Sequence, residues 1–160
     1  MKKLILMRHS NAENDSPTIP DIERNITEKG IQLIKTQALK LQKKSLFPDR
    51  IITSPAKRAF NTAALLAKQL NIHSNITIES FLYDDYTTQE FLNYLRKMPD
   101  SLDTVLIVGH NPTISRIASL LTNTHSFSFS PASIAVISIS VEQWQFIEVE
   151  LFKAKLFMAP

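Results

Sequence analysis

The chain has 160 residues, of which 44% are hydrophobic and 21% are charged, which is the composition of an ordinary soluble globular protein. This length predicts a single domain over residues 1–160. The net charge of +3 is not concentrated in one block, so we expect no nucleic-acid partner, whereas small anions remain compatible. The chain contains no cysteine, which excludes disulfides and thiolate chemistry, and no apolar run is long enough for a membrane span. We therefore expect a cytoplasmic protein with no membrane partner.

Apolar runs separated by turn residues predict strands that alternate with helices. In chain order we expect a strand at 4–7, a loop at 11–24, a helix at 28–44, a strand at 50–53, a helix from 55 to about 70, a strand at 76–78, a helix at 89–97, a strand at 104–108, a helix from 112 to about 121, and strands at 134–139 and 144–151.

Capping residues and one glycine add detail to this outline. Thr27, Ser54 and Asn111 are the expected N-caps of three helices, and a proline follows two of them at the first helical position. Gly30 lies inside a predicted helix, where glycine costs stability, so we expect another backbone to approach it closely.

The 11–24 loop is long for a compact domain, and loops of that length are often functional lids. His73 and His125 fall in other predicted loops and are expected at the surface.

The alternation of strands and helices predicts an α/β fold, a three-layer αβα sandwich with a mostly parallel mixed sheet. The last two predicted strands are joined by a short turn around residues 141–143. They should form a C-terminal antiparallel hairpin at one side of the sheet.

Three of the predicted strands end in polar segments: Arg8-His9-Ser10, Ser54 to Arg58, and Gly109-His110-Asn111. Because the carboxyl ends of parallel strands meet at one edge of a sheet, these segments should lie together. Two of them open helices, whose free backbone N–H groups favour an anion. Arg58 lies in a first helical turn, where the helix dipole disfavours a cation. A bound anion explains it better than the alternative, a surface arginine.

Two arginines and two histidines around one anion favour phosphoryl transfer. A neutral imidazole is a competent nucleophile toward phosphorus, and arginines can stabilise the charge on the transferring group. We therefore expect no metal and no other cofactor. A zinc site is the weaker interpretation, since neither histidine has further ligands at the spacing that zinc sites show. A glycine-rich phosphate loop is weaker still, since the chain has only two glycines.

Four motifs resemble the histidine phosphatase (phosphoglycerate mutase-like) superfamily, in particular the short SixA-type phosphohistidine phosphatases. They are Arg8-His9, the 24–30 segment Arg-Asn-Ile-Thr-Glu-Lys-Gly, the 54–59 segment Ser-Pro-Ala-Lys-Arg-Ala, and the 108–112 segment Val-Gly-His-Asn-Pro. They occur in the family's order over nearly the whole chain. Ser10 stands where the family signature has glycine.

The resemblance implies a phosphoglycerate mutase-like fold and a role for each matched residue. His9 is the implied nucleophile, which becomes phosphorylated, and Arg8, Arg58 and His110 complete the implied catalytic phosphate pocket. Ser10 and Arg24 are candidate substrate-binding residues beside it. Arg24 could instead form an ion pair with Asp21 or Glu23.

The implied activity is a metal-independent phosphatase that hydrolyses phosphohistidine on a protein partner, such as a histidine phosphotransfer domain, and releases phosphate. One alternative is a small-molecule phosphomonoesterase of the same superfamily, which needs a general acid. Glu79, Asp84 and Asp85 are the candidates, although exposed loop carboxylates are the favoured interpretation. Another alternative is a non-catalytic phosphoprotein-binding module, which would need only the arginines and neither His9 nor His110.

Overall fold

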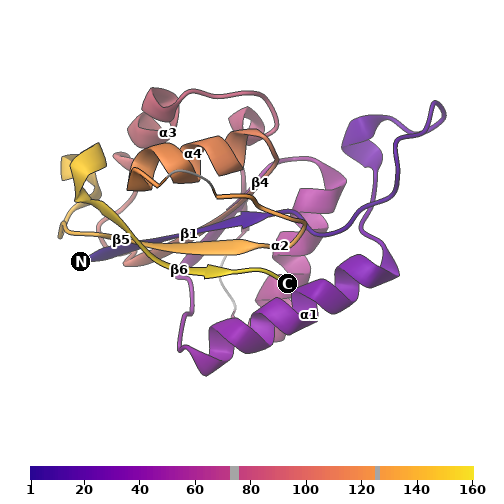
Figure 1. The fold of residues 1–160 in the computed structure, drawn as a ribbon, viewed down its shortest axis with the longest axis horizontal. Helices are drawn as coiled ribbons and strands as arrows, with labels where there is room; N and C mark the ends of the chain where they lie inside the picture. The colour runs from indigo at the N-terminus through magenta and orange to yellow at the C-terminus, as the bar shows by residue number, and fades with distance from the viewer. Residues whose placement is uncertain (73–75, 125–126) are drawn as a thin grey trace.

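The computed structural model describes residues 1–72, 76–124 and 127–160 (Figure 1); His73 and His125 lie outside these ranges. The elements in chain order are β1 (Lys2–Arg8), η1 (Asp21–Glu23), α1 (Glu28–Lys43), β2 (Arg50–Thr53), α2 (Lys57–Leu70), β3 (Ile76–Ile78), η2 (Ser80–Leu82), α3 (Thr88–Leu95), β4 (Thr104–Gly109), α4 (Thr113–Thr122), β5 (Ile134–Ile139), η3 (Trp144–Phe146), η4 (Val149–Leu151) and β6 (Phe152–Met158). Here η marks a short 3-10 helix.

The strands form one mixed sheet in the order β3-β2-β4-β1-β5-β6. β1, β2, β3 and β4 run parallel to one another, whereas β5 is antiparallel to both of its neighbours, β1 and β6. β4 and β1 occupy the middle of the sheet, which suits their continuous apolar sequences. The predicted fold class, with its parallel strands and C-terminal antiparallel pair, is confirmed.

Helices cover both faces of the sheet, α1 and α2 on one face and α3 and α4 on the other (Figure 1). A separate apolar core lies between the sheet and each pair of helices. Successive side chains of β1 point to opposite faces: Leu4 and Leu6 join the core under α3 and α4, whereas Ile5 and Met7 join the core under α1 and α2. All four are fully buried. None of the helices in the described ranges is both long enough and apolar enough to cross a bilayer.

Gly30 has the close backbone contact that its place in the sequence predicted. A Cβ atom at this position would collide with the carbonyl oxygen of Asn11. Thr27 caps α1 as expected, because its side chain accepts the Gly30 N–H at 3.1 Å. The contact presses the start of the long loop against the first turn of α1 and brings the loop back over the sheet edge.

Two predicted helix starts are wrong by one or two residues. α2 begins at Lys57, and Ser54 instead accepts the backbone N–H of Ala56 through its hydroxyl at 3.2 Å. α4 begins at Thr113, and the Asn111 amide donates to the carbonyl oxygen of Phe129 at 2.8 Å. Neither side chain accepts a backbone N–H from the first turn of its helix, and the Oδ1 of Asn111 instead accepts from the Ser115 hydroxyl at 2.7 Å.

The strand predicted at 144–151 is also wrong, because this segment forms the 3-10 helices η3 and η4. Trp144 is fully buried, and its indole N–H donates to the carbonyl oxygen of Leu102 at 2.7 Å. The Asp100 carboxylate accepts the backbone N–H of Trp144 at 2.9 Å. These contacts hold the segment against the apolar core with Trp144 buried in it. The strand that pairs with β5 is the later β6.

Candidate active site

Strand register brings the three polar segments to one edge of the sheet. In β1 and β4, Arg8 is opposite Gly109, and in β2 and β4, Thr53 is opposite Val108. The residue that follows each strand therefore emerges at nearly the same level. The rings of His9 and His110 lie with their centroids 5.0 Å apart. The prediction that the segments lie together is confirmed.

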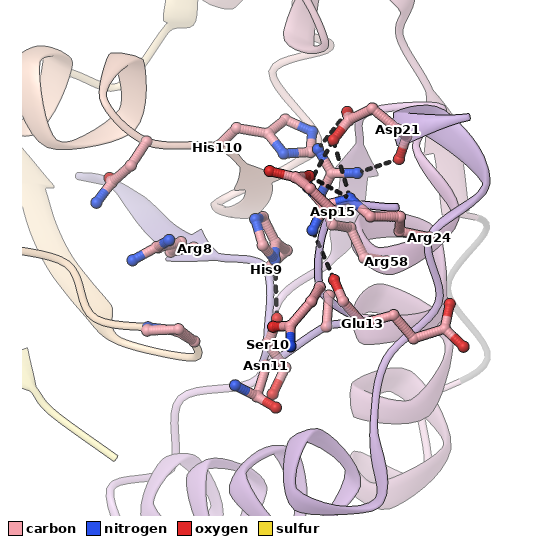
Figure 2. A pocket seen from close by; sticks show the side chains of 14 residues that line it. Arg8, His9, Ser10, Asn11, Glu13, Asp15, Asp21, Arg24, Arg58 and His110 are labelled. Carbon is pink, nitrogen blue, oxygen red and sulfur yellow. Dashed lines mark hydrogen bonds and ion pairs between the residues drawn. The ribbon is translucent and has the colours of Figure 1, made fainter. Parts of the chain in front are cut away.

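A pocket of about 470 Å³ opens at this edge (Figure 2). It is lined by all six residues that the sequence nominated, which are Arg8, His9, Ser10, Arg24, Arg58 and His110. The other lining residues come mainly from the 11–24 loop, which forms one wall and the rim. Such a pocket can enclose a phosphoryl group with part of its leaving group.

The two arginines of the pocket floor have unused donors. Arg58 is only 6% exposed, and its Nε has no hydrogen-bond partner among the residues that the structure describes. The same is true of the Nε of Arg8, whose Nη1 donates to the carbonyl oxygen of Phe129 at 2.9 Å. Burial, together with the positive charge of Arg58, lowers the pKa of Arg8. Two cations that approach each other with unsatisfied N–H groups form a site for an anion.

Hydrogen bonding settles which nitrogen of His9 carries the proton. Its Nδ1 lies 2.8 Å from the carbonyl oxygen of Ser10, and a carbonyl oxygen only accepts, so Nδ1 is the donor. Burial lowers the pKa of His9 to about 3; the bond to Ser10 opposes this, while the charges of His110, Arg58 and Arg8 add to it. The neutral ring therefore keeps a free lone pair on Nε2.

His110 supplies the second imidazole of the pocket. Its Nε2 lies 2.8 Å from the hydroxyl oxygen of Ser54, and its Nδ1 is buried without a partner among the described residues. The Ser54 hydroxyl accepts the Ala56 N–H and can either donate to Nε2 of His110 or accept from it, because its oxygen has two lone pairs. Where it donates, the proton of a neutral His110 is on Nδ1, the unpartnered atom. Burial, followed by the charge of Arg58, lowers the pKa of His110 to about 4.

We expect both imidazoles of the pocket to be neutral at pH 6, where an exposed histidine is largely charged. A lowered pKa means that each ring takes up its proton only as the pH falls toward 4 or 3. The measurement is an NMR titration of the ring resonances, assigned with His9→Ala and His110→Ala. Added tungstate should raise both pKa values, because a bound anion favours the imidazolium form. Titration of either ring near 6.5 in the free protein would contradict this.

Ser10 and Arg24 line the pocket but already have partners. The Ser10 hydroxyl donates to the carbonyl oxygen of Gly30 at 2.8 Å, and its backbone N–H donates to Thr62. Arg24 donates from Nε to the Asp21 carboxylate at 3.0 Å, which is one of the two ion pairs that the sequence left open. Their part in substrate binding stays a prediction.

The acidic residues of the pocket are not the ones that the sequence singled out. Glu79 accepts a hydrogen bond from Tyr94, and Asp85 accepts from Thr113 and Arg116. Together with Asp84, they are absent from the described lining of the pocket, where the carboxylates belong to Glu13, Asp15 and Asp21. In the sequence, Asp21 is a possible ion-pair partner of Arg24, whereas Glu13 and Asp15 are only polar residues of a loop whose length is typical of lids.

Chelating agents should leave any activity of this site unchanged. Across residues 1–72, 76–124 and 127–160, no three His, Cys, Asp or Glu side chains gather closely enough to hold a metal ion. The two pocket histidines have instead a carbonyl and a hydroxyl as partners. The measurement is turnover of p-nitrophenyl phosphate before and after dialysis against EDTA. Full loss of activity that one added metal restores would contradict the expectation.

Arginines and imidazoles at the carboxyl edge of an αβα sandwich form a pocket whose charge suits an anion. The sequence profile of the histidine phosphatase superfamily (branch 1) matches residues 4–83, half of the chain. The chain belongs to the histidine phosphatase superfamily. No curated protein sequence matches it.

Solved structures share the fold over nearly the full chain. The protein histidine phosphatase SixA complexed with tungstate matches with a TM-score of 0.84 and 20% identity, over 98% of this chain and 96% of that chain. A protein from Agrobacterium tumefaciens, provisionally named a phosphohistidine phosphatase SixA, has a TM-score of 0.80 and 22% identity over 99% of both chains. A mycobacterial glucosyl-3-phosphoglycerate phosphatase has a TM-score of 0.64 and 13% identity, over 97% of this chain and 96% of that chain. At these identities the likeness concerns the fold.

Proposed function

We propose that this protein is a metal-independent phosphatase that forms a covalent phosphohistidine intermediate on His9. The observation that carries the proposal is the neutral His9 ring, whose Nδ1 is tied to a backbone carbonyl so that its Nε2 lone pair is free. The ring lies beside His110, and Arg8 and the buried Arg58 line the same pocket. Nucleophile, donors and cationic charge are thus present together.

The reaction then has two steps. In the first, the Nε2 lone pair of His9 forms a bond to phosphorus, and the leaving atom takes the electron pair of the bond that breaks. The side chains of Arg8, Arg58 and His110 hold the equatorial oxygens, on which charge accumulates. In the second, the oxygen of a water molecule attacks phosphorus, the electron pair of the N–P bond returns to Nε2, and both protons of the water end on the released phosphate. Nδ1 of His9 keeps its proton throughout.

Phosphohistidine on a protein partner is the preferred substrate. None of the three acids proposed from the sequence lies in the described lining of the pocket. An alkoxide leaving group needs a proton in the transition state, whereas imidazole with a protonated second nitrogen leaves as a neutral molecule. Since SixA in complex with tungstate has the same fold, and tungstate is a phosphate analogue, the overall shape is compatible with this substrate class.

The test is turnover of a phosphohistidine peptide and of p-nitrophenyl phosphate, side by side, followed by a series of alkyl phosphates. We expect the first two to be hydrolysed and sugar phosphates to be poor substrates. The rival function, a small-molecule phosphomonoesterase, gains if sugar phosphates are turned over best. A non-catalytic binding module would bind phosphopeptides and release no phosphate from any of them.

The amide variants Glu79→Gln, Asp84→Asn and Asp85→Asn should each leave phosphohistidine turnover nearly unchanged. The physical reason is that Glu79 and Asp85 have partners outside the pocket, and a remote carboxylate cannot reach the leaving atom. The measurement is the dependence of kcat/KM on leaving-group pKa for aryl phosphates in each variant. A dependence that is flat in the wild type and becomes steep in one variant would identify that residue as a general acid.

A further inference from the structure

The 11–24 loop covers the pocket without burying any of its own residues. Every residue from 11 to 24 is exposed or half-buried, and none belongs to either apolar core. Only the start of the loop is tied to the chain that follows it: the Asn11 carbonyl oxygen accepts the Thr27 N–H at 3.0 Å, and the Asn25 carbonyl oxygen accepts the Glu13 N–H at 2.9 Å. The position of the remaining loop therefore depends on polar contacts, which open more easily than a packed core.

Asp21, in η1, makes the hydrogen bonds that join the middle of this loop to the rest of the fold (Figure 2). Its Oδ2 accepts from Arg58 Nη2 at 2.9 Å and from the Tyr83 hydroxyl at 2.8 Å, and its backbone carbonyl oxygen accepts from Arg58 Nη1 at 2.6 Å. Among the described residues, no other hydrogen bond leads from residues 14–24 to a residue outside the loop. One ion pair, between Glu23 and Lys57 at 4.0 Å, completes these links.

The Asp21 carboxylate is an anion held on an arginine of the phosphate pocket. Partial burial opposes its charge, but the hydrogen bonds from Arg24, Tyr83 and Arg58 outweigh this and hold the pKa of Asp21 well below its usual range. Side chain and backbone of Asp21 together engage both terminal nitrogens of Arg58, and only Nε is without a partner among the described residues. A two-point grip of Arg58 on a phosphoryl group therefore has to use a nitrogen that Asp21 already holds.

The charges that line the pocket point the same way. The two histidines are neutral, so the charge comes from three arginines and from three carboxylates of the loop, those of Glu13, Asp15 and Asp21. The arginines suit an anion, and in the free protein the loop itself supplies one. A phosphoryl group that enters meets arginines whose charge is already balanced, and it gains their full attraction only when the loop withdraws.

We propose that the 11–24 loop is a lid latched on Arg58 by Asp21, and that an incoming phosphoryl group opens it by taking the place of the Asp21 carboxylate. The inference rests on the phosphatase function proposed above and concerns how that site admits its substrate. On opening, the hydrogen bonds from Arg58 and Tyr83 to Asp21 break, whereas the bond from Arg24 persists because both residues belong to the loop. Opening offsets part of the binding free energy, so the free protein binds anions more weakly than its arginines alone would.

The experiment measures the affinity for tungstate by calorimetry in the wild type and in Asp21→Asn. We expect the Kd of the variant to be lower by roughly tenfold to hundredfold, the range for a hydrogen bond to a charged group. The amide can still accept from Arg58, but it brings no competing charge. Inorganic phosphate, as a second probe, should show the same direction, and the thermal midpoint shows that the variant is folded.

Tyr83→Phe separates the latch from the charge. It removes one of the three hydrogen bonds that fasten the loop and leaves every charge in place, and Tyr83 lies outside the described lining of the pocket. We expect tungstate affinity to rise by about two- to tenfold, the effect of one hydrogen bond. If Asp21→Asn does not fold, this variant decides, and an affinity equal to that of the wild type would contradict the latch.

Asp15→Asn is the matched control. Asp15 lies on the same pocket wall, but its side chain is 90% exposed and pairs with Arg24 at 3.2 Å and not with Arg58. The substitution removes the same charge and leaves the latch closed. We expect tungstate affinity to rise by no more than about fivefold, as for an exposed ion pair. A gain as large as that of Asp21→Asn would attribute the effect to the charge of the wall and overturn the inference.

The position of the loop gives a second readout. Because the chain has no cysteine, Thr18→Cys on the loop and Lys68→Cys on α2 provide two exposed sites for spin labels. Double electron–electron resonance measures the distance between the labels. Saturating tungstate should lengthen or broaden this distance, and Asp21→Asn should do so without tungstate. A distance that stays the same in both cases would mean that the loop is no lid.

Two further results would overturn the inference. Equal tungstate affinity in the wild type and in Asp21→Asn would mean that the anion binds with Asp21 in place. Weaker binding in Asp21→Asn would make Asp21 a support that orients Arg58. Failure of the proposed function is distinguishable, because it would appear as absence of turnover in the wild type, whereas the lid is tested by binding and distance alone.

Discussion

His9→Ala should lose turnover by a factor on the order of 10⁴–10⁶, the range seen when a nucleophile or its partner is removed from an enzyme that acts through a covalent intermediate. Binding of tungstate should persist. The physical reason is that Arg8, Arg58 and His110 keep their unpartnered N–H groups, so the anion site survives when the attacking lone pair is gone. Turnover by initial rate and tungstate affinity by calorimetry give the two measurements.

Trapping the intermediate distinguishes the two imidazoles. His9→Ala should give no acid-labile phosphoprotein after rapid quenching. His110→Ala should still give one, since its ring contributes a donor to the phosphoryl oxygens and not the lone pair that attacks. Wild-type turnover in His9→Ala, or labelling that disappears only in His110→Ala, would reverse the assignment of the nucleophile.

Arg58→Ala should reduce kcat/KM by roughly 10²–10³, the typical effect of removing one electrostatic donor to a transition state. Arg58→Lys should also be impaired, but less, because lysine keeps the charge and loses the planar fork that binds Asp21. Since Arg58 is only 6% exposed, the free energy of unfolding of each variant should be measured alongside its kinetics.

Lys57→Ala is the matched control for Arg58→Ala. It removes a cation from the neighbouring position of the same helical turn, where the side chain is half exposed and lies outside the described pocket lining. We expect its kinetics to be those of the wild type. Full activity of Arg58→Ala, or equal losses in both variants, would show that Arg58 has no specific role in catalysis.

Local patterns predicted most of the fold because they express short-range physics. The apolar runs of β1 and β4 are continuous, as strands covered on both faces require, and α1 begins where Thr27 can cap it. The 144–151 segment was misread because its alternating apolar residues suit a strand. A long-range contact, the buried Trp144 bonded to Leu102, decides otherwise.

Arg8, His9, Arg58 and His110 lie at or shortly after the ends of three strands that can be recognised in the sequence, and the rule that parallel strands end together predicts one site from them. What covers that site depends on contacts between distant parts of the chain. Asp21 reaches Arg58 and Tyr83 across sequence separations of 37 and 62 residues. No periodicity records such a contact, because it depends on how the 11–24 loop folds back when Gly30 lets the backbone of Asn11 approach α1. The acidic rim is therefore a property of the folded chain.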